Sequence, residues 1–401
     1  MAKVAVFGYG TVGSGIVEVI KTNQELIAQR AGEEVDIKYI LDLRDFPGDP
    51  YENLLVHDVE VILNDPEVSV IAEAMGGIKP AFDFTKRALS SGKSVCTSNK
   101  ELVEAKGAEL LAIAKENGAN YLFEASVGGG IPILRPLVTC LTADHIDAVT
   151  GILNGTTNYI LTKMAEDGAD FDTVLREAQN MGYAERNPEA DIEGHDAGRK
   201  IAIMASLITG KNVPYDKIYT EGITKITPKD FTYAKRMGMV IRLLAMYRER
   251  SGKFFAYVAP AMIGKKNPLY AVSDVFNGIL VHGNMLGEAM FYGAGAGKLP
   301  TASAVAGDVV DCVRAHGQQL PGGWSTEALD LSEHTFREKK FFIRVPAADA
   351  DAAEKVFEGS QRIDAGFADE VGLLTQSMDE VTFEEKAGQV PTMITRIRVE
   401  H

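Results

Sequence analysis

KVAVFGYGTVG, residues 3–13, joins a short apolar and β-branched run to three glycines. Apolar residues then recur at Val12, Ile16, Val19 and Ile20, the spacing of one face of an α-helix. A strand, a glycine-rich turn and a helix in this order are the context in which G-x-G-x-x-G indicates a dinucleotide-binding fold. The stretch therefore predicts the first βα unit of a Rossmann-like domain.

Each glycine of the turn has its own part in such a unit. Gly8 permits the tight turn, Gly10 lets the backbone approach a pyrophosphate, and Gly13 lets the helix pack closely on the strand. The helix start, at Thr11 and Val12, offers N–H groups and a positive dipole end to the phosphates. A glycine-rich turn that holds no ligand is the alternative.

The predicted second strand, residues 36–43, ends where such folds bind the adenosine ribose. An acidic residue there accepts from the 2′-hydroxyl of NAD, whereas an arginine binds the 2′-phosphate of NADP. Arg44 stands at this end between Asp42 and Asp45. The sequence favours NADP and leaves NAD open.

Further βα units follow along the first third of the chain. Strands are predicted at residues 59–63, 68–72 and 94–97, and helices at 80–90 and 102–116. Alternation of this kind predicts a parallel, doubly wound sheet that binds ligands at the carboxyl ends of its strands. Gly76, Thr97 and Lys100 lie in loops at two of those ends.

Composition excludes several classes of protein. A chain of 401 residues is long enough for two or three domains, and its net charge of −15 argues against a nucleic-acid partner. Three cysteines without C-x-x-C spacing are typical of a reducing compartment. No apolar stretch is long enough to span a membrane, so we expect a cytoplasmic protein.

GYAERNPEADIEGHDAGRK, residues 182–200, concentrates carboxylates in front of a lysine. Asp196 and Lys200 are four residues apart, so on a helix they share a face and can pair. An isolated D-x-x-x-K pattern would indicate an ordinary surface ion pair. Here the pattern is much longer, and it extends from Ala178 to Lys200.

This longer pattern, A-x-x-x-G-Y-A-x-x-N-P-x-x-D-I-x-G-x-D-x-x-x-K, resembles the homoserine dehydrogenase family. GILNGTTNYI at residues 151–160 and GAGAGKLPTASAV at 293–305 are similar to the same family. The resemblance implies interconversion of L-homoserine and L-aspartate 4-semialdehyde with a nicotinamide cofactor, in threonine and methionine biosynthesis. It also implies a homodimer or homotetramer.

The resemblance assigns catalytic parts to the lysine region. Lys200 is the expected proton donor to the aldehyde oxygen. Since a free lysine has a pKa of about 10.4, burial would have to lower that pKa. Asp196 would orient Lys200. Glu185, or as second choice Asp191, would bind the α-ammonium of the substrate. Lys100 or backbone N–H groups would bind the substrate's carboxylate.

Small polar residues of the second block complete the predicted substrate site. Thr156 and Tyr183, beside Gly155, are expected to contact the hydroxy-acid end of the substrate. Thr156 and its neighbour Thr157 precede an apolar helix, so a plain helix-capping turn is the alternative.

The resemblance extends to the cofactor and to a monovalent cation. Gly76, Thr97, Lys100 and Gly297 would line the nicotinamide half of the cofactor. The loop at residues 121–132 is similar to one that holds Na⁺ or K⁺ through main-chain oxygens in the family. Its ligands here would be Glu124, Val127, Gly129 and Ile131. A hinge without an ion is the alternative.

Three regions are predicted overall: a dinucleotide-binding domain at residues 1–130, completed by about 300–320; an α+β catalytic and dimerisation domain at 131–316; and a βαββαβ tail at 335–401. The tail resembles an ACT domain, although PAADADAA replaces the usual Asp-x-Pro-Gly loop. Its linker has few apolar residues to bind it to the core, so we expect a loosely attached tail that is dispensable for chemistry. Two other functions remain open: a non-catalytic nucleotide or amino-acid sensor, and a different dehydrogenase.

Overall fold

The computed structural model describes residues 1–400, and its contacts divide the chain into two compact units. The first unit comprises Met1–Asp144, Ala202–Tyr215 and Gly293–Leu329. The second comprises His145–Ile201, Asp216–Tyr292 and the residues from Asp330 onward. The three domain boundaries predicted from the sequence stay a prediction.

The first unit is built on a six-stranded parallel sheet in the order β3-β2-β1-β4-β5-β6. Its strands are β1 (Ala2–Phe7), β2 (Val35–Leu41), β3 (Leu55–Val56), β4 (Val68–Glu73), β5 (Ser94–Thr97) and β6 (Tyr121–Leu122). This order is the doubly wound arrangement that the first βα unit predicts, so the Rossmann-like fold is confirmed.

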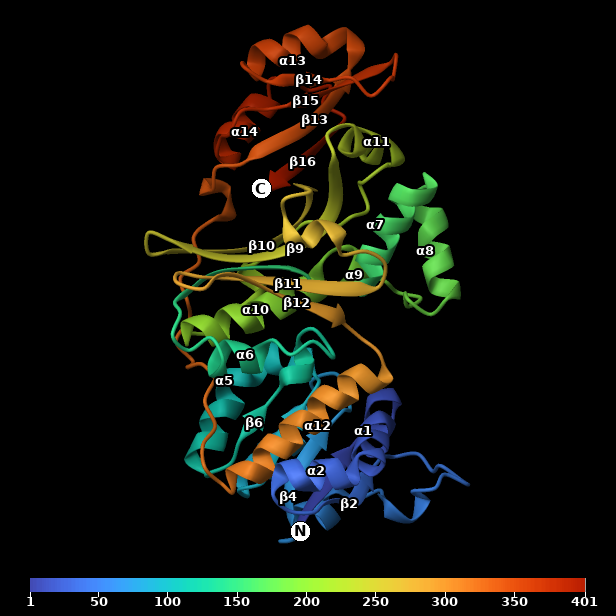
Figure 1. Cartoon of the computed structure of the whole chain (residues 1–401), viewed down its shortest axis with the longest axis vertical. Helices are drawn as coiled ribbons and strands as arrows, with labels where there is room; N and C mark the ends of the chain where they lie inside the picture. The colour runs from blue at the N-terminus through green and yellow to red at the C-terminus, as the bar shows by residue number, and fades with distance from the viewer. Residues whose placement is uncertain (401) are drawn as a thin grey trace. The chain divides into compact units, whose positions relative to one another are not determined.

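Helices cover this sheet: α1 (Thr11–Thr22), α2 (Gln24–Ala31), α3 (Val59–Leu63), α4 (Ala81–Ser90), α5 (Lys100–Glu116), α6 (Leu134–Thr139) and α12 (Lys298–Ala315). Figure 1 shows α1, α2 and α12 side by side, although α12 lies almost 300 residues later in the chain. Ile16 and Val17 of α1 share one core with Ala302 and Val305 of α12. The late segment therefore completes the core of the first unit.

One predicted strand of this unit is wrong. Residues 59–63 form helix α3, which Asp58 caps by accepting a hydrogen bond from the backbone N–H of Glu60 at 2.9 Å. A short apolar run can be a buried strand or a buried helix, and periodicity alone does not separate them. The capping aspartate was the signal for a helix.

The second unit holds a mixed sheet in the order β12-β11-β7-β9-β10-β16-β13-β15-β14, with β8 beside β10. Its strands are β7 (Ile146–Ile152), β8 (Tyr219–Thr220), β9 (Met239–Arg250), β10 (Lys253–Gly264), β11 (Phe276–Gly283), β12 (Gly287–Ala294), β13 (Lys340–Pro346), β14 (Gln361–Ile363), β15 (Glu370–Leu374) and β16 (Thr395–Glu400). The helices are α7 (Gly155–Asp167), α8 (Phe171–Asn180), α9 (Glu189–Ile192), α11 (Pro228–Arg236), α13 (Ala350–Val356) and α14 (Glu380–Ala387), and α10 (His195–Thr209) begins here.

The tail follows the predicted order βαββαβ, but it is not loosely attached. Its last strand, β16, pairs in parallel with β10, from Ala261 opposite Arg398 to Ile263 opposite Glu400. Figure 1 shows β14, β15, β13 and β16 following one another toward β10. The strands of the tail and those before it therefore form one sheet.

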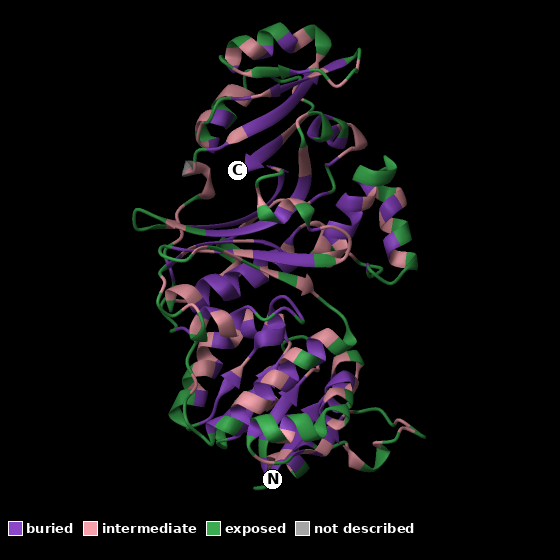
Figure 2. Cartoon of the chain, viewed as in Figure 1, coloured by how far each residue is buried: buried purple, intermediate pink, exposed green. Residues whose placement is uncertain are grey.

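The sheets are the most buried parts of both units. Figure 2 shows the strands of each unit largely buried, while α8 and α13 present exposed outer faces. Over residues 1–400, no helix combines the length and the apolar character needed to cross a membrane.

Candidate functional site

The glycine-rich turn of the first unit has the geometry that a pyrophosphate needs. Gly8 has φ +87°, and a Cβ on Gly13 would lie 1.8 Å from the carbonyl oxygen of Gly8. Gly10 precedes α1 without a side-chain cap, and a Cβ there would meet nothing within 4 Å. The start of α1, at Thr11 and Val12, is thus open to an anionic ligand. These residues fit the phosphates of a dinucleotide.

The end of β2 carries the acid and the arginine together. The Asp42 carboxylate accepts hydrogen bonds from the backbone N–H of Tyr9 at 2.8 Å and from the Arg44 guanidinium at 2.9 Å. The hydrogen bonds from Arg44 hold the pKa of Asp42 far below its ordinary value. The Arg44 side chain is 63% exposed and lies over the Phe46 ring, 5.1 Å from its centroid. Asp42 therefore orients Arg44 without covering it.

Glu73, a buried carboxyl group at the end of β4, was missed in the sequence. It accepts hydrogen bonds from the Thr97 hydroxyl at 2.5 Å and from the backbone N–H of Met75 at 2.7 Å. Burial raises its pKa. Asn99 extends the network by donating to the carbonyl oxygen of Gly77 at 2.6 Å. Glu73 ties the two predicted cofactor loops together, and a lone acid ending an apolar strand was the available signal.

The other predicted cofactor residues of this unit lie in turns and at helix starts. Gly76 has φ +77°, and Gly297, with φ +121°, directly precedes α12. Lys100 is the first residue of α5, whose N-terminus is capped by Asn99. Positive φ values explain why glycine stands at both turns.

In the predicted cation loop, the side chain of Glu124 binds backbone N–H groups of the protein. The Glu124 carboxylate accepts hydrogen bonds from the backbone N–H groups of Ile133, Leu134 and Arg135 at 2.5, 2.9 and 2.6 Å. It thereby satisfies the start of α6. In the described residues no group of three or more His, Cys, Asp or Glu side chains could hold a metal. A cation at this loop would depend on main-chain oxygens, as predicted, and Gly129 has the positive φ, +55°, of such a turn.

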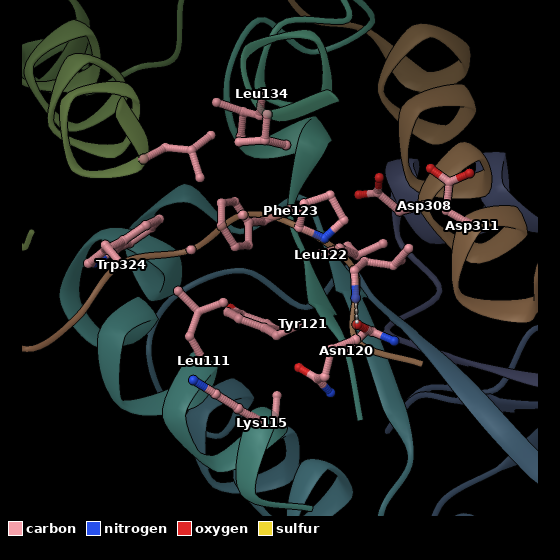
Figure 3. Close-up of a pocket in the computed structure, with 18 of the residues that line it drawn as sticks. Leu111, Lys115, Asn120, Tyr121, Leu122, Phe123, Leu134, Asp308, Asp311 and Trp324 are labelled. Carbon is pink, nitrogen blue, oxygen red and sulfur yellow. Dashed lines mark hydrogen bonds between the residues drawn. The ribbon is translucent and has the colours of Figure 1, made fainter. Parts of the chain in front are cut away.

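A cavity of about 970 Å³ lies in the first unit beside β6. Figure 3 shows Trp324 on one side of it, Asp308 and Asp311 on the opposite side, and Phe123 between them. Among the residues given a role from the sequence, Glu124 alone is found in its described lining. The cavity is therefore not where the predicted chemistry lies.

In the second unit, Lys200 is buried with only 8% of its surface exposed. Its ammonium donates to Asp196 Oδ2 at 2.7 Å and to the carbonyl oxygen of Leu153 at 2.7 Å. Asp196 and Lys200 lie one turn apart in the first turns of α10. The predicted pairing is present, and its burial distinguishes it from a surface ion pair.

Asn154 connects this pair to a second carboxylate, and the sequence analysis gave it no role. Its amide nitrogen donates to Asp191 Oδ1 at 2.7 Å and to Asp196 Oδ2 at 2.9 Å. Its amide oxygen accepts from the backbone N–H of Thr157 at 2.9 Å and caps α7. The Asn residue before Gly-Thr-Thr was a recognisable helix cap, but its bridging contacts depend on the fold.

The remaining predicted substrate residues lie at the start of α7 and after α8. The Thr156 hydroxyl donates to the carbonyl oxygen of Tyr183 at 2.6 Å, and the Tyr183 side chain is 46% exposed. Gly155 begins α7, where a Cβ would lie 2.7 Å from the carbonyl oxygen of Val275. Glu185 is exposed, and its main-chain oxygen accepts from Gln179. Thr156 and Tyr183 are therefore in contact, while Glu185 lies in the exposed loop between α8 and α9.

The first unit has a glycine-rich turn at the centre of a 3-2-1-4-5-6 sheet, and the second buries a lysine paired with a carboxylate. Together these features define a dinucleotide-dependent oxidoreductase. The comparisons agree. A family profile described as homoserine dehydrogenase, NAD binding domain, matches residues 8–124, and one described as homoserine dehydrogenase matches residues 132–310.

Individual relatives agree with the family profiles. A homoserine dehydrogenase of Pseudomonas aeruginosa is 36% identical over 99% of this chain and 92% of its own length. The crystal structure of a homoserine dehydrogenase from Thiobacillus denitrificans has a TM-score of 0.90 at 32% identity, covering 100% of this chain and 98% of that one. A hyperthermophilic archaeal homoserine dehydrogenase in complex with NADPH has a TM-score of 0.64 at 27% identity, covering 78% and 97%. The chain belongs to the homoserine dehydrogenase family.

Proposed function

We propose that this protein interconverts L-homoserine and L-aspartate 4-semialdehyde with a nicotinamide cofactor, a step of threonine and methionine biosynthesis. The observation that carries the proposal is the cluster of the buried Lys200, Asp196 and Asn154 with the half-buried Asp191 in a member of this family. The cofactor supplies hydride chemistry when bound, so the chain has to supply orientation and a proton.

Lys200 is the proton donor to the aldehyde oxygen in reduction and the acceptor in alcohol oxidation. Asp196 holds the ammonium in position through its 2.7 Å hydrogen bond. The carbonyl oxygen of Leu153 accepts a second hydrogen bond from the same ammonium at 2.7 Å, so two acceptors orient it. The same geometry serves both directions, because the donor and the acceptor of the proton exchange roles when the reaction is reversed.

Substrate binding falls to the surrounding polar residues. The substrate's α-ammonium is bound by Glu185, with Asp191 as the second carboxylate of the same segment. Thr156, Gly155 and Tyr183 contact the hydroxy-acid end, and Lys100 takes the carboxylate. A carboxylate that meets an ammonium forms a charge-assisted hydrogen bond, which is roughly twice as strong as one between neutral groups.

NADP is the preferred cofactor and NAD is also accepted. Arg44 supports this preference because its exposed guanidinium stands at the end of β2, already oriented by Asp42. The NADPH complex of the archaeal neighbour supports it as well. The pyrophosphate lies on the Gly8–Gly13 turn, and the nicotinamide half meets Gly76, Thr97 and Gly297. Na⁺ or K⁺ binds the main-chain oxygens of Glu124, Val127, Gly129 and Ile131.

The protein works as a homodimer or homotetramer in the cytoplasm. Large apolar side chains are exposed on the edge strand β12 and on the strand and turn before it: Phe276, Met285, Leu286, Met290 and Tyr292. Exposed apolar side chains grouped in this way are typical of a subunit interface. All three cysteines are free thiols, although the buried sulfurs of Cys96 and Cys312 lie only 3.6 Å apart, and this fits a reducing compartment.

Oxidation of NADPH in the presence of L-aspartate 4-semialdehyde, compared with a panel of other small aldehydes, tests the proposal. We expect turnover with the semialdehyde far above that with the other aldehydes. A different dehydrogenase would prefer another aldehyde. A non-catalytic sensor would bind NADPH, seen by its fluorescence, without turnover.

A further inference from the structure

We propose that Arg398, in the last strand of the tail, positions the loop that carries the substrate carboxylates, and that Glu221 transmits this contact. The inference rests on the proposed function in one respect, namely that residues 185–196 serve the substrate. It gives the tail a part in catalysis that requires no effector. Arg398 and Glu221 are positioning residues, because neither belongs to the predicted substrate site.

On the side of the tail, Arg398 is held in a buried ion cluster. Its side chain is 2% exposed and donates to Glu221 at 2.5 Å and to Glu380 of α14. The Glu380 carboxylate also forms ion pairs with the Lys339 ammonium at 3.1 Å and with the Arg396 guanidinium at 2.8 Å. Since Glu380 is shared by three cations, Glu221 is the second carboxylate that Arg398 needs in this low-dielectric setting.

Glu221 belongs to a short segment that is fixed on the sheet. Its backbone N–H donates to the carbonyl oxygen of Val258 in β10 at 2.8 Å. Tyr219, two residues earlier, donates its hydroxyl to the Glu221 carboxylate at 3.0 Å. The ring of His334 stacks on the Tyr219 ring at 4.1 Å between centroids. The segment is therefore held from both the sheet and the tail.

The next residues of this segment pack backbone to backbone on the substrate loop. A Cβ on Gly222 would lie 2.4 Å from the carbonyl oxygen of Ile192, the last residue of α9. The backbone N–H of Ile223 donates to that same oxygen at 2.9 Å. The Thr224 hydroxyl donates to Glu193 at 3.1 Å. Ile192 and Glu193 directly follow Asp191, so the position of the segment sets the position of that carboxylate.

The contact from Arg398 to Asp191 thus runs through Glu221, Gly222 and Ile192 without a gap. If Glu221 loses its charge, the attraction to Arg398 falls, and the part of the segment beyond the backbone hydrogen bond to Val258 is held less firmly. The hydrogen bond from Ile223 to the carbonyl oxygen of Ile192 then weakens, and Asp191 is less well fixed relative to Asn154. Because small displacements of orienting groups cost large factors in rate, we expect a weaker substrate complex with an unchanged cofactor complex.

Glu221→Gln is the main test variant. Its amide oxygen can still accept from Tyr219, and the Glu221 side chain is partly exposed, so the variant should fold. We expect the KM for homoserine to rise about tenfold and the KM for NADP to change less than twofold. Arg398→Lys keeps the positive charge on a shorter side chain, so it should raise the KM for homoserine by less than Glu221→Gln does.

Arg362→Gln is the matched control, because Arg362 is an exposed tail arginine that pairs with Asp351 and Glu354. It should leave both KM values unchanged. An unaltered homoserine KM in a folded Glu221→Gln protein, as judged by its melting temperature, would overturn the proposal.

Hydrogen–deuterium exchange over residues 189–194 supplies a readout that is independent of activity. We expect faster exchange in Glu221→Gln than in the wild type and in Arg362→Gln. If the wild type did not turn over homoserine, the proposed function would fail, while this measurement would still decide the coupling. Unchanged exchange in Glu221→Gln would overturn the coupling even if the enzyme were active.

Discussion

The surroundings of Lys200 support the role in proton transfer that we propose for it. Its ammonium sits between a carboxylate one helical turn away and the carbonyl oxygen of Leu153, 47 residues earlier. The first contact is local and the second depends on the fold. Together they fix the position of the ammonium, which is what the proposed general acid catalysis requires.

Lys200→Ala should abolish most turnover and leave cofactor binding nearly intact. General acid–base catalysis contributes about 10²–10⁴-fold, so kcat should fall on that scale. Steady-state kinetics measures kcat, and NADPH fluorescence titration measures binding. Lys211→Ala, at an exposed lysine that pairs with Glu327, is the control and should retain full activity. A kcat near that of the wild type in Lys200→Ala would remove the lysine from the mechanism.

Glu185→Gln should raise the KM for homoserine without changing the affinity for NADP. Loss of the charge weakens a charge-assisted hydrogen bond to the α-ammonium, which contributes about 1.5–3 kcal/mol. Homoserine saturation curves at saturating NADP measure the change. Glu189→Gln, at an exposed acid of the same segment, is the control. An unaltered KM would move the ammonium site to Asp191.

Arg44→Ala should weaken NADPH much more than NADH. Only NADPH carries the 2′-phosphate that a guanidinium can bind with two hydrogen bonds, and the variant also leaves the charge of Asp42 uncompensated. The ratio of kcat/KM for the two cofactors measures the effect, with Arg87→Ala as an exposed control. Equal losses with both cofactors would show that Arg44 does not read the phosphate.

At the scale of elements, β16 and α14 are joined by charges that are buried in the tail. Burial by itself would raise the pKa of Glu380, but Arg398 and Lys339 outweigh it and lower the pKa to about 2. The folded pKa thus lies below the unfolded value of 4.5. The ionised cluster stabilises the fold above about pH 4.5, and this contribution is lost as the pH falls toward 2.

Glu380→Gln should therefore be less stable than the wild type at pH 7, by up to about 3 kcal/mol. The difference in the free energy of unfolding should narrow as the pH falls from 4.5 to 2, because protonation neutralises the same group in the wild type. Urea denaturation at a series of pH values measures both proteins. Glu384→Gln, at an exposed partner of Arg396, should stay close to the wild type throughout. A constant difference would contradict the assignment.

At the scale of the whole molecule, the continuous sheet of the second unit decides how the tail can be treated. Tail strand β16 covers an edge of β10 at residues 261–263, and Glu400 accepts from the Tyr257 hydroxyl at 2.9 Å. Sequence composition predicted a loosely attached module, because few apolar residues precede it. The attachment instead uses backbone pairing and buried ion pairs.

Deletion of the chain after residue 329 should yield aggregated or poorly folded protein. The deletion exposes an edge of β10 and leaves Glu221 without Arg398, and unpaired strand edges promote association. Size-exclusion chromatography and circular dichroism measure the outcome. Arg362→Gln, a change on the tail surface, should remain well behaved. A monodisperse, active truncated protein would show that the sheet is stable without the tail.

Features that depend on near neighbours in the chain could be determined from the sequence alone. The spacing of Gly8, Gly10 and Gly13 follows from sterics within one turn, and the Asp196–Lys200 pair follows from helical geometry. The alternating βα pattern predicted the parallel sheet, because a helix between two strands returns the chain to the same end of the sheet. At residues 59–63 local information failed, since a five-residue apolar run suits both helix and strand.

Features that join distant segments were decided by the tertiary structure. Asn154 meets Asp196 across 42 residues, Glu73 meets Thr97 across 24, and Arg398 meets Glu221 across 177. In the sequence nothing distinguishes these pairings, because the two partners are brought close only when the sheets assemble. Burial then makes the contacts strong, since a polar group removed from water must be satisfied by another group of the protein.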